Sequence, residues 1–255
     1  MTSSLLFAPL LCALAPHAHT RRDHLTNSAA ALSATALTNL APRSAFAADA
    51  PTTVVVAGAT GQTGRRVLER LAAKADVAAV GGVRNVDKAM KALGESSVVL
   101  RGAMVQAVGS VDTSAVALKQ LDVEKDSVGA MAATLQGAGA LVIATGFVPG
   151  NPFQMNSAAH AVDNVGTIAL VDAAKSAGVK KVVLVSSILT NGRAWGQEKS
   201  PGFVVTNAFG NVLDEKLVAE KYLRSSGLDY TIVRPGGLKA TPPSGALVVS
   251  AEDTL

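Results

Sequence analysis

The amino-acid sequence predicts an α/β fold in which a doubly wound parallel sheet is covered by helices on both faces. Short runs of Val, Ile and Leu, such as residues 54–56 and 140–143, are typical of strands that are buried on both faces. Between these runs, apolar residues recur at helical spacing, as Val67, Leu68 and Leu71 do. The regular alternation of the two patterns after Pro51 favours a single domain with a parallel sheet.

The elements follow one another in a strand–helix alternation. Six stretches rich in Val, Ile and Leu predict strands, namely residues 52–59, 77–84, 115–123, 140–146, 180–188 and 229–237. Five stretches with amphipathic spacing predict helices, namely residues 63–75, 85–93, 126–138, 158–178 and 211–227. Asn85 is a suitable N-cap for the second helix. The glycine-punctuated segment 102–114 predicts neither a helix nor a strand.

The first 47 residues have the composition of a targeting presequence, so the folded domain is expected at residues 48–255. An apolar stretch, "SSLLFAPLLCALA", is followed by a segment rich in Ala, Ser and Thr with few acids, which together indicate a signal followed by a plastid transit peptide. This arrangement predicts the stroma of a secondary plastid. A bacterial-type export signal with a linker is an alternative, and Arg21-Arg22 with a cleavage site after Ala47 leaves the thylakoid lumen open.

Composition excludes several classes of function. Aromatic residues make up 4% of the chain and the net charge is +4, with the basic residues scattered, so we expect no specific nucleic-acid binding. No apolar run reaches the length of a transmembrane helix. The single cysteine, Cys12, lies in the presequence, and His160 is the one histidine after residue 47. Disulfides, thiol nucleophiles and histidine-rich metal sites are therefore not expected in the domain.

Three glycines, Gly58, Gly61 and Gly64, follow the first predicted strand and open the first helix. Such a loop presents backbone N–H groups and a helix N-terminus to a pyrophosphate, which predicts a Rossmann-like dinucleotide site. The loop residues expected to contact the ligand are Gly58, Thr60, Gly61, Gln62, Thr63 and Gly64. A nucleoside triphosphate loop is excluded because no Lys-Ser or Lys-Thr closes the motif, whereas a purely structural turn stays open as the alternative.

Arg84 ends the second predicted strand, where folds specific for NAD place a carboxylate. A guanidinium matches the geometry of a ribose 2′-phosphate, so the residue favours NADP(H) as the cofactor. Lys88, one helical turn further on, offers a second positive charge. The alternative is that Arg84 is an ordinary solvated surface residue.

Several motifs resemble those of the atypical short-chain dehydrogenase/reductase proteins of chloroplasts, a group related to the dehydrogenase-like component of the chloroplast import apparatus. They include "VAGATGQTGRRV", "GVRNVDKA", "LDV", "ATGF", "DNVGTIALVDAAKSAGVKKVVLVSSILTNG" and "YTIVRPGGLK". The resemblance implies that Asp122 and Val123 contact the adenine. It further implies that the turn formed by Ala144, Thr145 and Gly146 runs along the cofactor, and that Pro235 and Gly236 border the nicotinamide.

The usual catalytic set of this family is incomplete. A tyrosine four residues before a lysine donates a proton, and the lysine lowers the pKa of the tyrosine. Ser187 and Lys216 match the serine and lysine positions, but Val212 stands where the tyrosine belongs. Neither Tyr222 nor Tyr230 has a lysine four residues later.

Three functions therefore remain open. The first is a plastid module that binds NADP(H) for redox sensing or assembly with little turnover, together with a plastid protein partner. The second is an NADPH-dependent reductase of an unknown small molecule, and the third is a scaffold without cofactor. After Gly237 the chain has few residues for the elements that cover the nicotinamide in the family, so we expect these to be short or missing, unless the natural protein continues.

Overall fold

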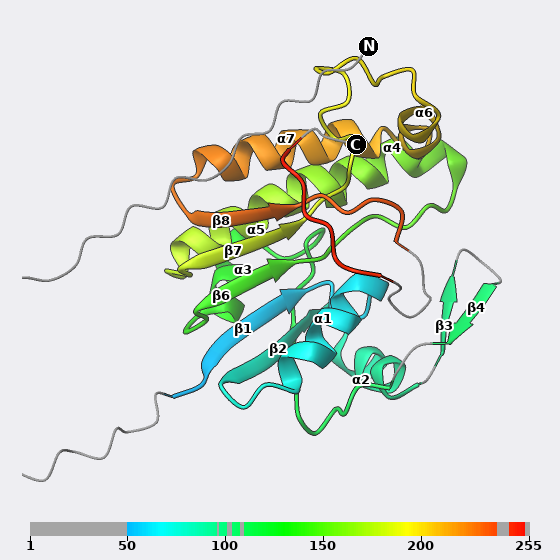
Figure 1. Cartoon of the computed structure of the whole chain (residues 1–255). Helices are drawn as coiled ribbons and strands as arrows, with labels where there is room; N and C mark the ends of the chain where they lie inside the picture. The colour runs from blue at the N-terminus through cyan, green and yellow to red at the C-terminus, as the bar shows by residue number, and fades with distance from the viewer. Residues whose placement is uncertain (1–49, 96, 101–103, 108–109, 239–244, 253–255) are drawn as a thin grey trace, which may run out of the picture. The chain divides into compact units, whose positions relative to one another are not determined.

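The computed structural model describes residues 50–252 except 96, 101–103, 108–109 and 239–244. Its main feature is a six-stranded parallel sheet in the order β5-β2-β1-β6-β7-β8, with helices packed against it (Figure 1). The predicted doubly wound α/β fold is thereby confirmed. The presequence predicted for residues 1–47 lies outside the described residues.

Every predicted strand and helix has a counterpart in the structure. The strands of the sheet are β1 (Thr52–Ala57), β2 (Val77–Val83), β5 (Ala117–Gln120), β6 (Ala140–Ile143), β7 (Lys181–Val185) and β8 (Asp229–Val233). The α-helices are α1 (Gln62–Ala72), α2 (Val86–Gly94), α3 (Val128–Leu135), α4 (Met155–Ala159), α5 (Thr167–Ser176), α6 (Pro201–Asn207) and α7 (Val212–Ser225). Among the described residues, no helix is long and apolar enough to cross a lipid bilayer.

The order of the strands positions the candidate site. β1 is parallel to β2 on one side and to β6 on the other. The chain runs outward from β1 to β2 and β5, returns to β6, and then runs outward through β7 to β8 (Figure 1). The direction of winding therefore reverses between β1 and β6, and ligands of such sheets bind where the loops diverge at the carboxyl ends of these strands.

The two faces of the sheet form two cores. Val55 of β1 packs in a cluster with Leu141 of β6 and Leu170 of α5. The next residue, Val56, points to the opposite face and packs in a cluster with Leu68 of α1. Because successive residues of β1 are buried on opposite faces, the strand is an unbroken apolar run rather than an alternating one.

One pair of strands lies outside this pattern. β3 (Ser97–Leu100) and β4 (Met104–Ala107) form a separate antiparallel hairpin. β4 falls in segment 102–114, for which the sequence predicts no element. The hairpin projects beside α2 (Figure 1).

α6 is a further element that the sequence pattern does not predict, because Pro201-Gly202 is typical of a turn. The Oγ of Ser200 accepts a hydrogen bond from the N–H of Phe203 at 3.3 Å, and proline occupies the first turn. Proline at the start of a helix loses no backbone hydrogen bond. A serine followed by proline is therefore the signal that identifies this helix.

The helix predicted for residues 158–178 is divided into three parts. α4 continues into a π-helical segment, η2 (His160–Gly166), and then into α5. The Oγ1 of Thr167 donates to the carbonyl of Val162 at 3.2 Å, a contact across the widened turn. A 3-10 turn, η1 (Pro152–Gln154), precedes α4. Isolated π-helical turns are frequent at functional sites.

Candidate functional site

The glycine loop between β1 and α1 has a shape that only glycine permits at two positions. Gly58 has a φ of +79°, and a Cβ there would lie 2.8 Å from the carbonyl oxygen of Ala144. A Cβ on Gly64 would collide with the carbonyl oxygen of Gly58. At Gly61, a Cβ would lie 3.2 Å from the same oxygen. The three glycines therefore allow the loop, the neighbouring turn and the helix to approach one another closely.

The loop is held by backbone hydrogen bonds and leaves the start of α1 open. The N–H groups of Gly58 and Ala59 donate to the carbonyl of Gly82 in β2 at 3.2 and 3.3 Å. Gly61 is the N-cap, without a side-chain cap, and the first turn contains no acidic residue. Within the described residues, the first N–H groups of α1, those of Gln62 and Thr63, thus face the loop without a side-chain oxygen to cap them, which suits an anion.

Arg65, in the first turn of α1, is a buried residue that the sequence analysis misses. Its side chain is 1% exposed and donates to the carbonyls of Ala92 at 2.7 Å and Leu93 at 2.8 Å, and also to that of Glu95. These carbonyls belong to the end of α2, where helix carbonyls have no partner within the helix, and that of Leu93 also accepts from the N–H of Val111 at 3.0 Å. Burial lowers the pKa of Arg65. Arg65 therefore links the start of α1, which follows the glycine loop, to the end of α2.

Arg84 lies directly after β2, at the edge of the crevice. Its side chain is 73% exposed, and its Nη1 is 4.0 Å from the Oε2 of Glu124, itself an exposed residue after β5. The following residue, Asn85, caps α2 by accepting a hydrogen bond from the N–H of Lys88 at 2.8 Å. Arg84 is therefore positioned by a capped helix and a strand end, while its guanidinium keeps access to solvent.

The turn after β5 contains Asp122 and Val123. Asp122 is buried; its Oδ1 accepts from the N–H of Glu124 at 3.1 Å, and its own N–H donates to Asp126 at 2.7 Å. Val123 packs closely against Gly166, where a Cβ would lie 2.9 Å from the valine side chain. Asp122 therefore shapes its own turn, and its placement at this edge is compatible with the predicted contact to adenine.

The turn after β6 contains an orphaned polar atom. Ala144 donates its N–H to Ala57 at 3.0 Å, which holds the turn beside the glycine loop. The Oγ1 of Thr145 is buried and has no hydrogen-bond partner among the described residues. Buried hydroxyls are almost always paired, so one without a protein partner at a crevice is suited to bind a ligand.

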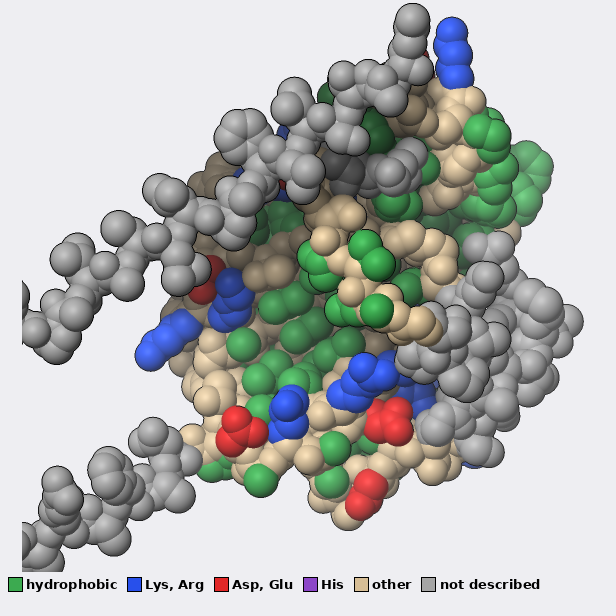
Figure 2. Space-filling view, in the orientation of Figure 1, with side chains coloured by type: hydrophobic (Ala, Val, Ile, Leu, Met, Phe, Trp, Pro, Cys, Tyr) green, Lys and Arg blue, Asp and Glu red, His purple; other side chains and the backbone are tan. Residues whose placement is uncertain are grey.

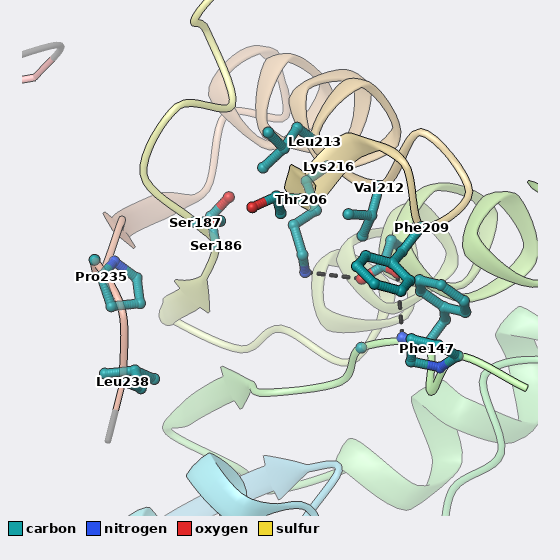
Figure 3. A pocket seen from close by; sticks show the side chains of 14 residues that line it. Phe147, Ser186, Ser187, Thr206, Phe209, Val212, Leu213, Lys216, Pro235 and Leu238 are labelled. Atoms are coloured by element: carbon teal, nitrogen blue, oxygen red, sulfur yellow. Dashed lines mark hydrogen bonds and ion pairs between the residues drawn. The ribbon is translucent and has the colours of Figure 1, made fainter. Parts of the chain in front are cut away.

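A pocket of about 330 Å³ continues from this turn along the carboxyl ends of β6, β7 and β8 (Figure 3). Its walls come from the ends of these strands, from η2, and from α6, α7 and the connection between them. They comprise Gly146, Phe147, Pro149, Asp163, Ser186, Ser187, Thr206, Phe209, Val212, Leu213, Lys216, Pro235, Gly236 and Leu238. The pocket thus brings together five predicted site residues, Gly146, Ser187, Lys216, Pro235 and Gly236.

Lys216 reaches from α7 into this pocket and pairs with Asp163 of η2 (Figure 3). The Nζ of Lys216 lies 2.8 Å from the Oδ1 of Asp163, with side chains 17% and 0% exposed. The other carboxylate oxygen of Asp163 accepts from the N–H of Phe147 at 3.2 Å. Asp163 is missing from the sequence-based site, because an aspartate within a helix usually faces solvent. It connects the turn after β6 to α7.

No tyrosine lines the pocket within the described residues. Val212, at the tyrosine position, forms part of its wall. Tyr222 donates to the carboxylate of Asp172 on the outside of α7, and this hydrogen bond raises the pKa of the phenol. Tyr230 lies in β8 and does not line the pocket.

The two serines after β7 have different surroundings. Ser186 is buried and donates to Glu220, a carboxylate that is 0% exposed and also accepts from Thr190 at 3.1 Å and from the Nε of Arg234 at 3.1 Å. This network ties the ends of β7 and β8 to α7. Ser187, one of the predicted site residues, lies in the wall of the pocket.

His160 lies outside the pocket. Its Nδ1 is 3.0 Å from the Oε2 of Glu215, and Asn164 donates to the same oxygen at 2.7 Å. His160 and Asn164 share one face of the helix, as their spacing predicts, but that face contacts a neighbouring residue of α7. The cluster therefore joins η2 to α7 at the surface.

These residues fit a dinucleotide. The glycines bring the backbone of the loop, the neighbouring turn and the helix start close together, the start of α1 lacks a side-chain cap, and Thr145 has an unused buried hydroxyl. The three features lie along the switch between β1 and β6, where a cofactor of this fold extends from phosphates to nicotinamide. The arrangement can bind an anion at one end and a planar ring at the other.

Comparison with known proteins agrees with this geometry. Residues 95–255 match the family described as NAD(P)H-binding. An uncharacterised chloroplast protein of Arabidopsis thaliana is 42% identical over 206 residues, which cover 79% of this chain and 65% of that protein. The chloroplast protein TIC 62 of Pisum sativum is 33% identical over 217 residues, covering 79% of this chain and 36% of that protein. The chain thus spans less than two thirds of both relatives.

A solved structure shows the same fold. It is that of an oxidoreductase from Lactococcus lactis, with a TM-score of 0.58 and 25% identity, covering 76% of this chain and 73% of that one. Family match, relatives and fold agree with the resemblance to chloroplast proteins of the atypical short-chain dehydrogenase/reductase type, which is thereby confirmed. The chain belongs to the NAD(P)H-binding family.

Proposed function

We propose that this chain is a plastid protein that binds NADP(H) and serves as a redox-sensing or assembly module with little turnover. One observation supports the proposal: a close-packed glycine loop that fits a dinucleotide lies near a pocket in whose wall Val212 stands four residues before Lys216, where the family has a tyrosine. The glycine loop supports binding, and the valine supports slow chemistry.

The phosphates belong at the start of α1. Gly58, Gly61 and Gly64 permit close approach, and the N–H groups of Gln62 and Thr63 would hold the pyrophosphate beside the exposed Thr60. Within this scheme the buried hydroxyl of Thr145 gains a partner, since it lies in the turn that contacts the glycine loop.

The adenosine end belongs at the edge of β2 and β5. Arg84 supplies a guanidinium for the ribose 2′-phosphate, which favours NADP(H) over NAD(H). Its weak contact with Glu124, at 4.0 Å between exposed groups, breaks at little cost. Asp122 and Val123 form the turn under the adenine.

The nicotinamide end belongs at the edge of the pocket, beside the wall residues Gly146, Pro235 and Gly236, with Ala144 in the preceding turn. When bound, NADPH supplies a hydride there. Lys216 and Ser187 are placed to orient the ligand, but a donor of the strength and position of a phenol is missing from the described wall. Little turnover with ordinary ketones is the consequence.

A second candidate is an NADPH-dependent reductase of an unknown small molecule. It is favoured by the pocket itself, which retains Ser187 and Lys216 at the family positions, and by the related fold of an oxidoreductase. The third alternative, a scaffold without cofactor, is disfavoured because it gives no role to the uncapped start of α1, to the orphaned hydroxyl of Thr145 or to Arg84 after β2.

For location, we propose the stroma of a secondary plastid, with the thylakoid lumen as the alternative. Support comes from the composition of residues 1–47 and from two relatives that are chloroplast proteins. A plastid protein is the expected partner, because the related TIC 62 is also a chloroplast protein. Imaging of the full chain fused to a fluorescent protein tests the location.

The decisive experiment is a calorimetric titration of residues 48–255 with NADPH and NADH, followed by a screen for NADPH oxidation. Tight binding of NADPH with negligible turnover supports the module. Oxidation of NADPH with a particular compound would instead support a reductase. If neither NADPH nor NADH binds, the protein is a scaffold without cofactor.

A further inference from the structure

The pocket beside the nicotinamide position carries no net charge. Lys216 and Asp163 are the charged side chains in its described wall, and their charged atoms lie 2.8 Å apart. The Asp163 side chain is 0% exposed, and its second oxygen is occupied by the N–H of Phe147. An anionic ligand would therefore have to compete with a buried carboxylate for the one ammonium group, and would meet a repelling charge next to it.

The rest of the wall is mostly apolar and includes two aromatic rings. Phe147 follows β6 and Phe209 lies between α6 and α7, and both belong to the wall of the pocket (Figure 3). The hydroxyl of Ser186 donates to Glu220. The hydroxyls of Ser187 and Thr206 in the wall can therefore bind a polar atom of a ligand. These features suit a planar ring that carries one or two uncharged acceptors such as a carbonyl oxygen.

The apolar surface continues outside the pocket. Val148 stands between two wall residues and is 72% exposed, and Val205 precedes Thr206 of the wall and is 62% exposed. Hydrophobic side chains gather at the surface around α6 (Figure 2). A helix turns by about 100° per residue, so Val205 flanks Thr206 whereas Val204 points about 160° away from it. We call these two exposed valines, which neighbour wall residues in the chain, the rim of the pocket.

From these contacts we propose that the pocket receives an uncharged, planar carbonyl compound whose apolar extension lies on the rim of Val148 and Val205. This inference rests on the proposed function, because it names the ligand class of the same site. The paired charges exclude carboxylates and phosphates as the group that enters. The exposed valines favour a ligand that is longer than the pocket.

The position of α6 and α7 makes this wall a fixed one. Asn207 donates to Asp214 at 2.7 Å and accepts from the N–H of Leu213 at 3.0 Å, which joins the two helices. Arg193 adds two contacts to Asp214 at 2.8 Å. Because these hydrogen bonds within the protein hold the wall, selectivity is set by the charges and shape of the wall itself.

The test compares acetophenone with benzoate, which has nearly the same shape but carries a negative charge. Binding to the protein saturated with NADP⁺, where no turnover occurs, is measured by ligand-observed NMR. We expect acetophenone to bind at least about tenfold more tightly than benzoate. Asp163→Asn leaves Lys216 without its counter-charge and should raise benzoate affinity by about tenfold. Glu215→Gln, next to Lys216 in sequence but outside the pocket, should leave the preference unchanged.

The rim is tested with 4′-butylacetophenone. Its alkyl chain should improve affinity by about tenfold over acetophenone, because it buries methylene groups on Val148 and Val205. Val205→Asp should remove this gain, and Val204→Asp should retain it. Equal binding of benzoate and acetophenone, no binding of either, or loss of the gain in both valine variants would overturn the proposal.

Failure of the cofactor proposal is recognised separately. The same ligands are measured without nucleotide, and NADPH binding is titrated independently. If the nucleotide does not bind but the preference for the neutral ring and its response to Asp163→Asn persist, the ligand class stands and the proposed function falls. If NADPH binds and the preference is missing, the ligand class falls alone.

Discussion

The Nζ of Lys216 lies 2.8 Å from the Oδ1 of Asp163, whose other oxygen accepts from the turn after β6. A residue of α7 and a residue of the π-helical turn thus hold one wall of the pocket against the end of a sheet strand. In the family's usual arrangement the lysine assists a tyrosine, whereas here it has a buried carboxylate as its partner and Val212 one turn before it. The predictions below separate the roles of these and other groups.

Restoring the missing phenol should create activity. Val212→Tyr places a tyrosine four residues before Lys216, in the wall of the pocket. We expect NADPH oxidation with simple ketones to rise by up to about a hundredfold, since a positioned general acid contributes at least that much. Steady-state absorbance measures it. Val212→Phe, with the same ring but no hydroxyl, is the control, and equal rates in the two variants would contradict the assignment of this position.

Arg84 should determine the choice of cofactor. Arg84→Ala is expected to weaken NADPH binding by about tenfold or more, because a charge-assisted hydrogen bond contributes about 1.5–3 kcal/mol, while NADH binding changes little. Calorimetry with both nucleotides measures the ratio. Lys91→Ala, a change of charge at the far end of α2, is the matched control. An unmutated protein that binds both nucleotides equally well would rule out this role.

The glycine loop should tolerate no side chain. Gly61→Val is expected to abolish NADPH binding while the domain stays folded, because a Cβ at this position already lies 3.2 Å from the carbonyl oxygen of Gly58 and the branched atoms occupy the phosphate space. Circular dichroism and nucleotide titration distinguish folding from binding. Gly129→Ala in α3, where a Cβ meets nothing closer than 4.0 Å, should leave both unchanged. Normal binding by the valine variant would make the loop purely structural.

Arg65 should be important for stability. Arg65→Ala leaves the carbonyls of Ala92, Leu93 and Glu95 without their buried donor, and we expect the free energy of unfolding to fall by about 2–4 kcal/mol. Arg66→Ala removes a side chain whose described bond is to Gln62 in its own helix, and should cost less than about 0.5 kcal/mol. Urea denaturation of both variants makes the comparison. Equal losses would show that burial of Arg65 is not decisive.

The wall formed by α6 and α7 should weaken in acid. The hydrogen bond from Arg193 holds the pKa of Asp214 below its ordinary value. A carboxylate with a lowered pKa adds stability above its unfolded pKa of about 3.9 and loses it as the pH falls through the folded value. Asp214→Asn should therefore unfold at a lower temperature than the unmutated protein at pH 6, with the difference shrinking below about pH 4. In an Arg193→Met background the same substitution should have a much smaller effect, which a double-mutant cycle measures.

The sequence predicts the fold well because its evidence is local. The unbroken Val54–Val56 run and the spacing of Val67, Leu68 and Leu71 each depend on burial patterns that every strand and helix of this kind must satisfy. The glycines after β1 are equally predictable, because backbone geometry alone requires them at Gly58 and Gly64.

The parts of the site that the sequence does not reveal depend on distant partners. Aspartate and arginine within a helix are usually exposed to solvent, so the sequence gives no sign that Asp163 and Arg65 are buried. Asp163 is buried because it pairs with Lys216, 53 positions later in the chain. Arg65 is buried because it donates to carbonyls at the end of α2. α6 is missed for a different reason, since a proline and a glycine at its start are also the residues of a turn. The contacts of Asp163 and Arg65 therefore depend on residues that are distant in the sequence, which local propensity does not reveal.

The widened turn of η2 has a consequence for how the protein tolerates change. Seven residues, His160–Gly166, form turns that each hold more residues than an α-helical turn, and Asp163, 2.8 Å from Lys216, lies within them. Removing a single residue would let the segment return to regular helix while α5 keeps its register against the sheet, so the change would be confined to the side chains of the segment itself. The ion pair between Asp163 and Lys216 therefore depends on the length of this segment as well as on its chemistry, and a one-residue deletion would displace Asp163 without displacing α5.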